Sequence, residues 1–370
     1  MPDYLPCWFL PAACALIGAC IGSFLNVVIY RLPRNLSINE PKRSFCPACK
    51  KSIPWYRNIP VASWLILRGK CANCHSRISF RYWIVEVMTA LLFAATAYVC
   101  RDESPLLLVP LLGWTAMGIA IAFIDAEHMI VFPRDTVIAG LLGVSAALLS
   151  PPWMEELPFL TERLEASFIG AAAGYIGIRL VIELGKKLFG TWKRDFPVGS
   201  RWELREPSTD EEELTLVLPD GDYTWSDLFS RDSDRAIFTA AQLEIDGSSV
   251  PGDTFTLYQN RIVSGDGTIF LIESIKSASG TLEHIQANRE AMGYGDAWIM
   301  MMIGALCGWE GVLFCLVAGS LTGIIAGLAG RIGFGQPIPF GPCLLFAAAI
   351  WILGGYELWA WYCEWLLVPL

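Results

Sequence analysis

Long apolar runs constrain this chain more than any other feature. Several of them approach the roughly 20 residues that a helix needs to cross a bilayer. Hydrophobic residues make up 54% of the chain and the mean hydropathy is +0.46, which argues against a soluble globular protein. We therefore predict a polytopic α-helical membrane protein with about eight transmembrane helices. The expected spans are residues 8–30, 83–100, 106–124, 136–150, 165–184, 297–308, 312–330 and 342–363.

Basic residues predict the orientation of these spans, because Lys and Arg stay preferentially on the cytoplasmic side of short loops. Residues 31–81 hold eleven Lys and Arg residues against the single acid Glu40. We therefore expect this loop in the cytoplasm and the N-terminus outside. The first span is expected to be a retained helix rather than a secretory signal, because no basic residue precedes it and Arg31 follows it.

Two aspartates lie at the ends of apolar runs. Asp125 closes the third expected span, and Asp296 opens the sixth, directly after Gly293, Tyr294 and Gly295. A carboxylate at the mouth of a membrane helix is costly and points to function, and both are expected on the cytoplasmic face. If they approach each other, they would share one proton and act as the acid dyad of an aspartic protease. The alternative is that each aspartate only caps its helix.

Four cysteines in the basic loop form two pairs of matching spacing, Cys46-x2-Cys49 and Cys71-x2-Cys74. This spacing suits four thiolates around a tetrahedral metal ion, zinc above all. Cytoplasmic thiols rarely persist as disulfides, so a metal site is favoured over two disulfide bridges. Four thiolates leave no open position for an activated water, which predicts a structural site. His75 is a further candidate to replace one thiolate.

A polar insertion, residues 186–290, separates the fifth and sixth expected spans and is too long to lack structure of its own. It holds 11 Lys and Arg against 19 Asp and Glu, a net charge of −8. We predict a small β-rich cytoplasmic module that binds assembly partners or is tolerated decoration. Residues 186–194 are expected at the lipid headgroups, and residues 281–292 as a helix leading to Asp296. The expected strands are residues 215–218, 242–245, 254–258 and 268–272.

These features divide the chain into five expected regions. They are a first transmembrane helix at 1–30, a cytoplasmic tetracysteine zinc-binding loop at 31–82, transmembrane helices two to five with the first aspartate at 83–185, the β-rich insertion at 186–290, and transmembrane helices six to eight at 291–370.

The motifs together resemble the type IV prepilin peptidase family. The first span ends in the run from Gly22 to Pro33, GSFLNVVIYRLP, which is similar to the family's N-terminal signature. Within that run, Gly22, Ser23 and Asn26 are interpreted as helix-packing surface rather than as catalytic groups. Further similar segments are residues 55–60, 63–65, 68–70, 78–82 leading to Glu86, and 338–342.

This resemblance implies a membrane-embedded aspartic endopeptidase of the bacterial inner membrane, which removes the short basic leader of prepilins and pseudopilins at the cytoplasmic face. It implies Asp125 and Asp296 as the catalytic aspartates, and Gly293 and Gly295 as glycines that let the helix start approach the substrate. It also implies N-methylation of the new N-terminus with S-adenosylmethionine, although no glycine-rich fingerprint marks the binding residues. The implied partners are prepilin and pseudopilin substrates, membrane lipid and pilus or type II secretion assembly proteins, with no nucleic acid.

Three features depart from the family's pattern, and the largest is the insertion at residues 186–290. Pro133 is followed by Arg134 where the family has an aspartate, and the acid arrives one place later as Asp135. The residues after Asp296 also lack the family's lysine. An inactive assembly scaffold of the same fold is therefore an alternative function. An ion transporter is another, and it would place acids deep within the spans and on both membrane sides.

Overall fold

The computed structural model describes residues 6–41, 44–189, 191–206, 213–229, 234–239, 241–288, 293–329 and 339–367. The chain divides into two compact units: a helical unit of Met1–Ile178 with Tyr294–Leu370, and a β unit of Arg179–Gly293. The expected insertion at residues 186–290 falls inside the β unit. The other regional boundaries remain predictions.

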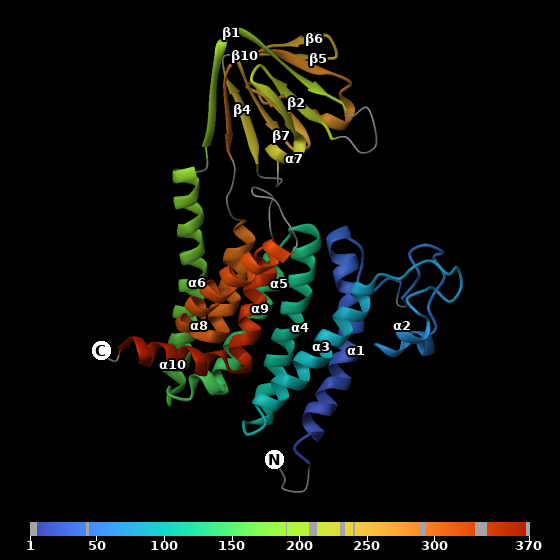
Figure 1. Ribbon diagram of the computed structural model, residues 1–370, viewed down its shortest axis with the longest axis vertical. Coiled ribbons are helices and arrows are strands. Elements are labelled where there is room, and N and C mark those ends of the chain that lie inside the picture. Colours follow the sequence, from blue (N-terminus) through green and yellow to red (C-terminus); the bar gives the residue numbers. More distant parts are fainter. Residues whose placement is uncertain are drawn as a thin grey trace. The chain divides into compact units, whose positions relative to one another are not determined.

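Six helices in the described part of the chain are long and apolar enough to cross a membrane. They confirm the predicted class of a helical membrane protein (Figure 1). The long helices are α1 (Phe9–Arg31), α3 (Phe80–Val99), α4 (Pro105–His128), α6 (Leu160–Phe189) and α8 (Tyr294–Ala329), while the sixth span joins α9 (Gly341–Ile350), a turn at Trp351–Gly355 and α10 (Tyr356–Leu367). The cysteine loop contains the short helix α2 (Ala62–Ile66).

Two features account for the difference from the eight expected spans. The expected span at 136–150 lies in α5 (Pro133–Leu148), whose 16 residues extend only about 24 Å against the roughly 30 Å of a bilayer core. The expected spans at 297–308 and 312–330 both lie in α8, which has 36 residues and is interrupted at Gly308. Gly308 has φ 69° and ψ −175°, a conformation that ends a helix and that glycine tolerates.

Contacts with α9 indicate that the two halves of α8 run in opposite directions. Ile299 in the first half packs against Gly341 at the start of α9, and Gly323 in the second half lies beside the residues that open α9. Near the interruption, Gly311 instead lies beside Trp351, just beyond the end of α9. Helix α8 is therefore a hairpin, and its two arms correspond to the two expected spans.

Glycines bring several helices into backbone contact. A Cβ on Gly22 of α1 would lie 2.8 Å from the Cα of Glu86 on α3, and a Cβ on Gly170 of α6 would lie 2.3 Å from the carbonyl oxygen of Gly304 on α8. Membrane helices associate through such small residues, because lipid leaves no hydrophobic force to drive them together. The packing role expected for Gly22 is confirmed.

The β unit is one antiparallel sheet of ten described strands (Figure 1). Strands β1 (Thr191–Arg205) and β10 (Ala278–Asn288) pair along their length, with Thr191 opposite Asn288, so the chain enters and leaves the sheet side by side. The order is β3-β2-β1-β10-β4-β7-β8-β9, and β5 pairs with β10 and β6. The others are β2 (Thr215–Leu218), β3 (Gly221–Thr224), β4 (Arg235–Thr239), β5 (Gln242–Ile245), β6 (Ser248–Val250), β7 (Thr254–Tyr258), β8 (Arg261–Ser264) and β9 (Ile269–Leu271), with the short helix α7 (Trp225–Leu228) after β3.

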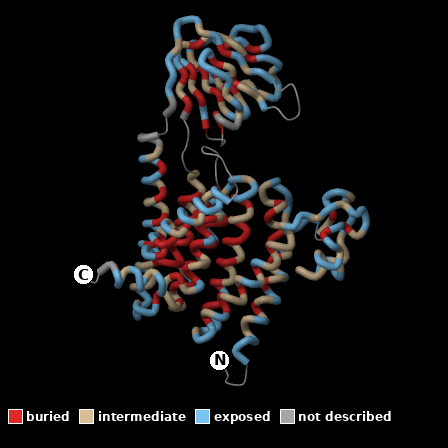
Figure 2. The backbone as a smooth tube through the Cα atoms, viewed as in Figure 1, coloured by how far each residue is buried: buried red, intermediate tan, exposed pale blue. Residues whose placement is uncertain are grey.

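The four expected strands coincide with β2, β5, β7 and β9. Buried residues alternate with more exposed ones along β2, β5 and β7, whereas β9 contains no buried residue (Figure 2). The helix expected at 281–292 is wrong as far as residue 288, because β10 occupies this segment; residues 289–292 lie outside the described chain. Leu282 and Ile285 are both buried and three residues apart, a spacing that imitates a helix. This spacing of buried residues arises instead because β1 and β10 pair irregularly here: the register of β1 shifts between Asp195 and Ser200.

Candidate functional site

Asp125 lies in the last turn of α4. The helix ends at His128, and Met129 then takes a left-handed conformation with φ 52°, its N–H donating to the Asp125 carbonyl oxygen at 2.8 Å. The Asp125 residue is only 6% exposed. A negative charge near the C-terminus of a helix is opposed by the helix dipole, so capping does not explain why an aspartate stands here.

Asp296 lies in the first turn of α8 and is 7% exposed. Gly293 precedes this helix and Gly295 belongs to its first turn. A Cβ on Gly295 would lie 2.7 Å from the Cγ2 atom of Val131, in the segment that follows α4. Because Gly295 has no side chain, the start of α8 can pack against the segment that follows Asp125 and the end of α4. The helix ends that carry the two aspartates are neighbours.

Helix α9 closes the site through Gly341, which the sequence analysis noted only within a motif. A Cβ on Gly341 would lie 2.5 Å from Oδ2 of Asp125 and 2.6 Å from Cδ1 of Ile299, one turn after Asp296. The missing side chain makes room for the Asp125 carboxylate beside the helix that carries Asp296. The thiol of Cys343 on α9 lies near enough to interact electrostatically with both carboxylates.

A third aspartate of the helical unit is also buried but has a different environment. Asp135 is 8% exposed and lies in the first turn of α5, where the helix dipole favours a negative charge. Arg134 donates to its Oδ1 from Nε at 3.1 Å. The start of α5 and Arg134 thus give the Asp135 carboxylate a local electrostatic explanation, which Asp125 lacks.

Polar contacts link the ends of α1, α3 and α4. Arg81 at the start of α3 forms an ion pair with Glu127 in the last turn of α4, two residues after Asp125. Asn26 near the end of α1 donates from Nδ2 to the carbonyl oxygen of Tyr82 at 2.9 Å. Both ends of the cysteine loop, which connects α1 to α3, therefore lie at the same end of the helical unit as Asp125.

The four cysteines of this loop converge. The sulfur atoms of Cys46, Cys49, Cys71 and Cys74 all lie within 4.8 Å of one another, and those of Cys46 and Cys74 are 3.8 Å apart. Zn–S bonds of about 2.3 Å in a tetrahedron place the sulfur atoms about 3.8 Å apart, so the cluster fits zinc.

The two cysteine pairs adopt the same turn. Lys50 N–H donates to the Cys46 carbonyl at 2.8 Å, His75 N–H donates to the Cys71 carbonyl at 2.9 Å, and Lys50 and His75 both have φ 58°. His75 thus occupies the position of Lys50 and lies outside the ligand cluster. A hydrogen bond from the Cys49 backbone lowers the pKa of the Cys46 thiol to about 6, whereas the pKa of its neighbour Cys49 is raised to about 11, because burial and the nearby thiols outweigh a hydrogen bond from the Lys51 backbone. The fit to zinc therefore rests on the positions of the four sulfur atoms.

Two family models match parts of the chain. Residues 16–100 match the model described as the bacterial peptidase A24 N-terminal domain, and residues 256–328 match the model described as the type IV leader peptidase family. The first match includes the four cysteines, and the second includes Asp296. No solved structure matches the chain.

Three of the relatives found are named prepilin leader peptidase/N-methyltransferase. That of Myxococcus xanthus is 39% identical over 174 residues, which cover 47% of this chain and 48% of the relative. That of Dichelobacter nodosus is 36% identical over 201 residues, covering 47% of this chain and 66% of the relative. That of Aeromonas hydrophila is 27% identical over 383 residues, covering 96% and 94%. The chain thus aligns with about half of the first relative, about two thirds of the second and nearly all of the third.

Proposed function

Because this chain belongs to the type IV prepilin peptidase family, we propose that it is a membrane-embedded aspartic endopeptidase that removes the short basic leader of prepilins and pseudopilins. The observation that supports the proposal is that the helix ends carrying two buried aspartates are neighbours: Gly341 lies against both Asp125 and Ile299, which is one turn after Asp296.

The proposed chemistry divides acid and base roles between these two carboxylates. Neighbouring carboxylates share one proton, because two negative charges at short range repel each other. The ionised carboxylate removes a proton from water, and the water oxygen attacks the carbonyl carbon of the scissile peptide bond. The protonated carboxylate donates to the carbonyl oxygen as the tetrahedral intermediate forms. Gly293, which has no side chain, would give the substrate chain room to approach Asp296, whereas Gly295 positions the start of α8 against Val131.

We propose that this site opens to the cytoplasm, with the N-terminus outside, in the inner membrane of a bacterium. Support comes from the polar contacts that join the ends of α1 and α4 to the start of α3, and from the glycine contacts that join α4 to the starts of α8 and α9. The eleven Lys and Arg residues at 31–81 follow α1 directly, and basic loops remain in the cytoplasm.

We further propose a structural zinc ion and an N-methyltransferase activity. Cys46, Cys49, Cys71 and Cys74 would hold the zinc, which would supply folding energy to the loop between α1 and α3. S-adenosylmethionine would supply the methyl group for the new N-terminus. The β unit would bind assembly proteins of a pilus or of a type II secretion system through its acidic surface.

Co-expression with a prepilin tests the peptidase proposal. Asp125→Ala and Asp296→Ala should each abolish leader removal while the protein remains in the membrane, because neither carboxylate alone can act as base and acid. The matched control is Asp135→Asn, which alters a third buried aspartate and should retain cleavage. Wild-type protein that leaves the leader intact would favour the inactive scaffold, and cleavage by Asp125→Ala would exclude the dyad.

A further inference from the structure

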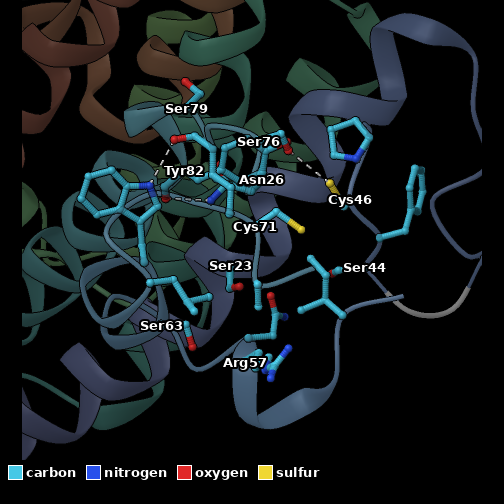
Figure 3. Close-up of a pocket in the computed structure, with 18 of the residues that line it drawn as sticks. Ser23, Asn26, Ser44, Cys46, Arg57, Ser63, Cys71, Ser76, Ser79 and Tyr82 are labelled. Atoms are coloured by element: carbon cyan, nitrogen blue, oxygen red, sulfur yellow. Dashed lines mark hydrogen bonds between the residues drawn. The ribbon is translucent and has the colours of Figure 1, made fainter. Parts of the chain in front are cut away.

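A cavity of about 380 Å³ lies in the helical unit between α1, α3 and the cysteine loop, and Figure 3 shows side chains that line it. Asn26 reaches it from α1, and Tyr82 reaches it from α3. Neither Asp125 nor Asp296 is among its lining residues. A peptide bond that these aspartates cleave must lie within hydrogen-bond reach of them, so the substrate backbone is held on another surface.

The segment that connects α4 to α5, residues 129–132, adjoins both helix ends of the proposed dyad. Its first residue donates its backbone N–H to the carbonyl oxygen of Asp125 at 2.8 Å. Its third residue, Val131, lies against Gly295 in the first turn of α8, where a Cβ would be 2.7 Å from Val131 Cγ2. We refer to residues 129–132 as the connecting segment. A chain bound along it would pass beside the two aspartates.

Much of the backbone of the connecting segment is unpaired. Ile130, Val131 and Phe132 belong to no helix or strand, and Phe132 is extended, with φ −88° and ψ 115°. In the part of the chain that the structure describes, no hydrogen bond is formed by the N–H groups of Ile130, Val131 and Phe132 or by the carbonyl groups of Met129, Ile130 and Val131. Adjacent unpaired backbone groups of this kind are a template for pairing with another chain.

The connecting segment is also apolar and partly uncovered. Met129 is 42% exposed and Ile130 is 41% exposed. A peptide that adds to such an edge gains main-chain hydrogen bonds for affinity and side-chain contacts for specificity. Pairing also keeps the substrate extended. In a helix the scissile carbonyl would accept a hydrogen bond from its own chain, whereas in an added strand it is available to a protonated carboxylate.

We propose that the connecting segment binds the part of a prepilin that contains the scissile bond, as an added strand paired with the backbone of residues 129–132. The inference rests on the proposed peptidase function and deepens it, because it names the surface that holds the substrate backbone beside Asp125. It assigns this role to main-chain groups, which a search for catalytic side chains does not find.

Pairing along this segment has a distinct pattern. Backbone groups of successive residues in a strand point to opposite sides. The substrate therefore donates one N–H to the Ile130 carbonyl on one side of the segment, or two N–H groups to the Met129 and Val131 carbonyls on the other side. In the second case the two donating residues are two positions apart, with a residue between them that does not donate.

Amide-to-ester replacement in the substrate tests this pattern without altering the enzyme. Synthetic peptides span the cleavage site of a prepilin that the full-length protein processes, and each carries one ester in place of one peptide bond other than the scissile bond. The ester removes one N–H donor. The value of kcat/KM should fall about fivefold to tenfold, the worth of one hydrogen bond, at a single position or at two positions separated by one unaffected position. Mass spectrometry checks that the same bond is cleaved.

An enzyme variant assigns the pairing to the connecting segment. Replacement of Val131 by the α-hydroxy analogue of valine keeps the side chain, removes the Val131 N–H and weakens the Ile130 carbonyl as an acceptor. It should lower kcat/KM for the unmodified peptide about fivefold to tenfold. The same replacement at Val198, an exposed residue of the β unit, is the matched control and should leave kcat/KM unchanged.

Three results would overturn the inference. They are losses at adjacent ester positions or at positions three or four apart, no loss at any ester position, and an unchanged kcat/KM for the Val131 replacement. Each of them leaves the peptidase proposal standing, because the unmodified peptide is still cleaved. Failure of the wild-type protein to cleave the unmodified peptide and the intact prepilin would instead contradict the proposed function itself.

Discussion

The helical unit and the β unit treat buried polar groups differently. The core of the β unit is built on stacked rings, with Phe238 and Phe255 at a centroid separation of 4.3 Å and Trp202 against both. The helical unit instead buries several groups that could be replaced by apolar ones at a gain in stability, such as Asp125 and Asp296. Among the described residues the β unit buries two polar side chains, those of Asp234 and Ser264, whereas the helical unit buries ten, three of them aspartates. Costly burial is therefore concentrated in the helical unit, where we expect the site.

Apart from changes to the aspartates themselves, the largest effect is expected where a glycine makes room for an aspartate. In Gly341→Ala the new methyl group would lie 2.5 Å from Asp125 Oδ2, so the carboxylate must move. A displacement of this size should lower the rate of prepilin cleavage about a hundredfold. Gly323→Ala is the control, because its nearest neighbour would be 3.7 Å away. Equal rates for the two variants would show that Gly341 does not position Asp125.

Measurement of zinc content tests the cysteine loop independently of the rest of the helical unit. Purified protein should contain about one zinc ion per chain, and Cys46→Ser should lose it, because a closed four-thiolate site cannot spare a ligand. The loop should then become sensitive to protease, because a structural metal contributes folding energy. Cys20→Ser, which alters an exposed cysteine of α1, should keep the metal. An ordered loop in metal-free protein would contradict the assignment.

A core substitution in the β unit should affect stability and leave catalysis unchanged. Phe238 is fully buried, so Phe238→Ala should destabilise the β unit by about 3–5 kcal/mol. Native-state proteolysis of the full-length protein measures this loss. The exposed neighbour Thr239→Ala should stay within about 0.5 kcal/mol of wild type. Loss of prepilin cleavage in Phe238→Ala would mean that the β unit helps to build the peptidase site.

Removal of most of the β unit should also change prepilin cleavage little. Because Arg194 is paired with Ile285, residues 195–284 can be replaced by a two-residue Asn-Gly hairpin turn. Prepilin cleavage should stay within about twofold of wild type, since a unit with adjacent ends can be removed without altering its host. A large loss in protein that still binds zinc would contradict the separation of the two units.

Predictions from the sequence succeeded where the information is local. The cysteine pairs and the apolar runs follow from spacing and composition, and the structure contains both. The environment of Gly341 depends on three helices that are distant in sequence, and no local pattern signals it. The cavity between α1 and α3 is likewise tertiary. The mistaken helix at 281–292 had the opposite cause, because Leu282 and Ile285 followed a local helical spacing that pairing with β1 overrides.

Kinetics of a double substitution test the central claim that Asp125 and Asp296 act as one unit. Single-turnover cleavage of a purified prepilin is measured for Asp125→Asn, Asp296→Asn and the double variant, with zinc content as the control for folding. Each single change should slow cleavage by at least about a thousandfold, and the double variant should be no slower than either, because catalytic groups that act together are strongly non-additive. Multiplicative losses, or a single variant near the wild-type rate, would contradict the dyad.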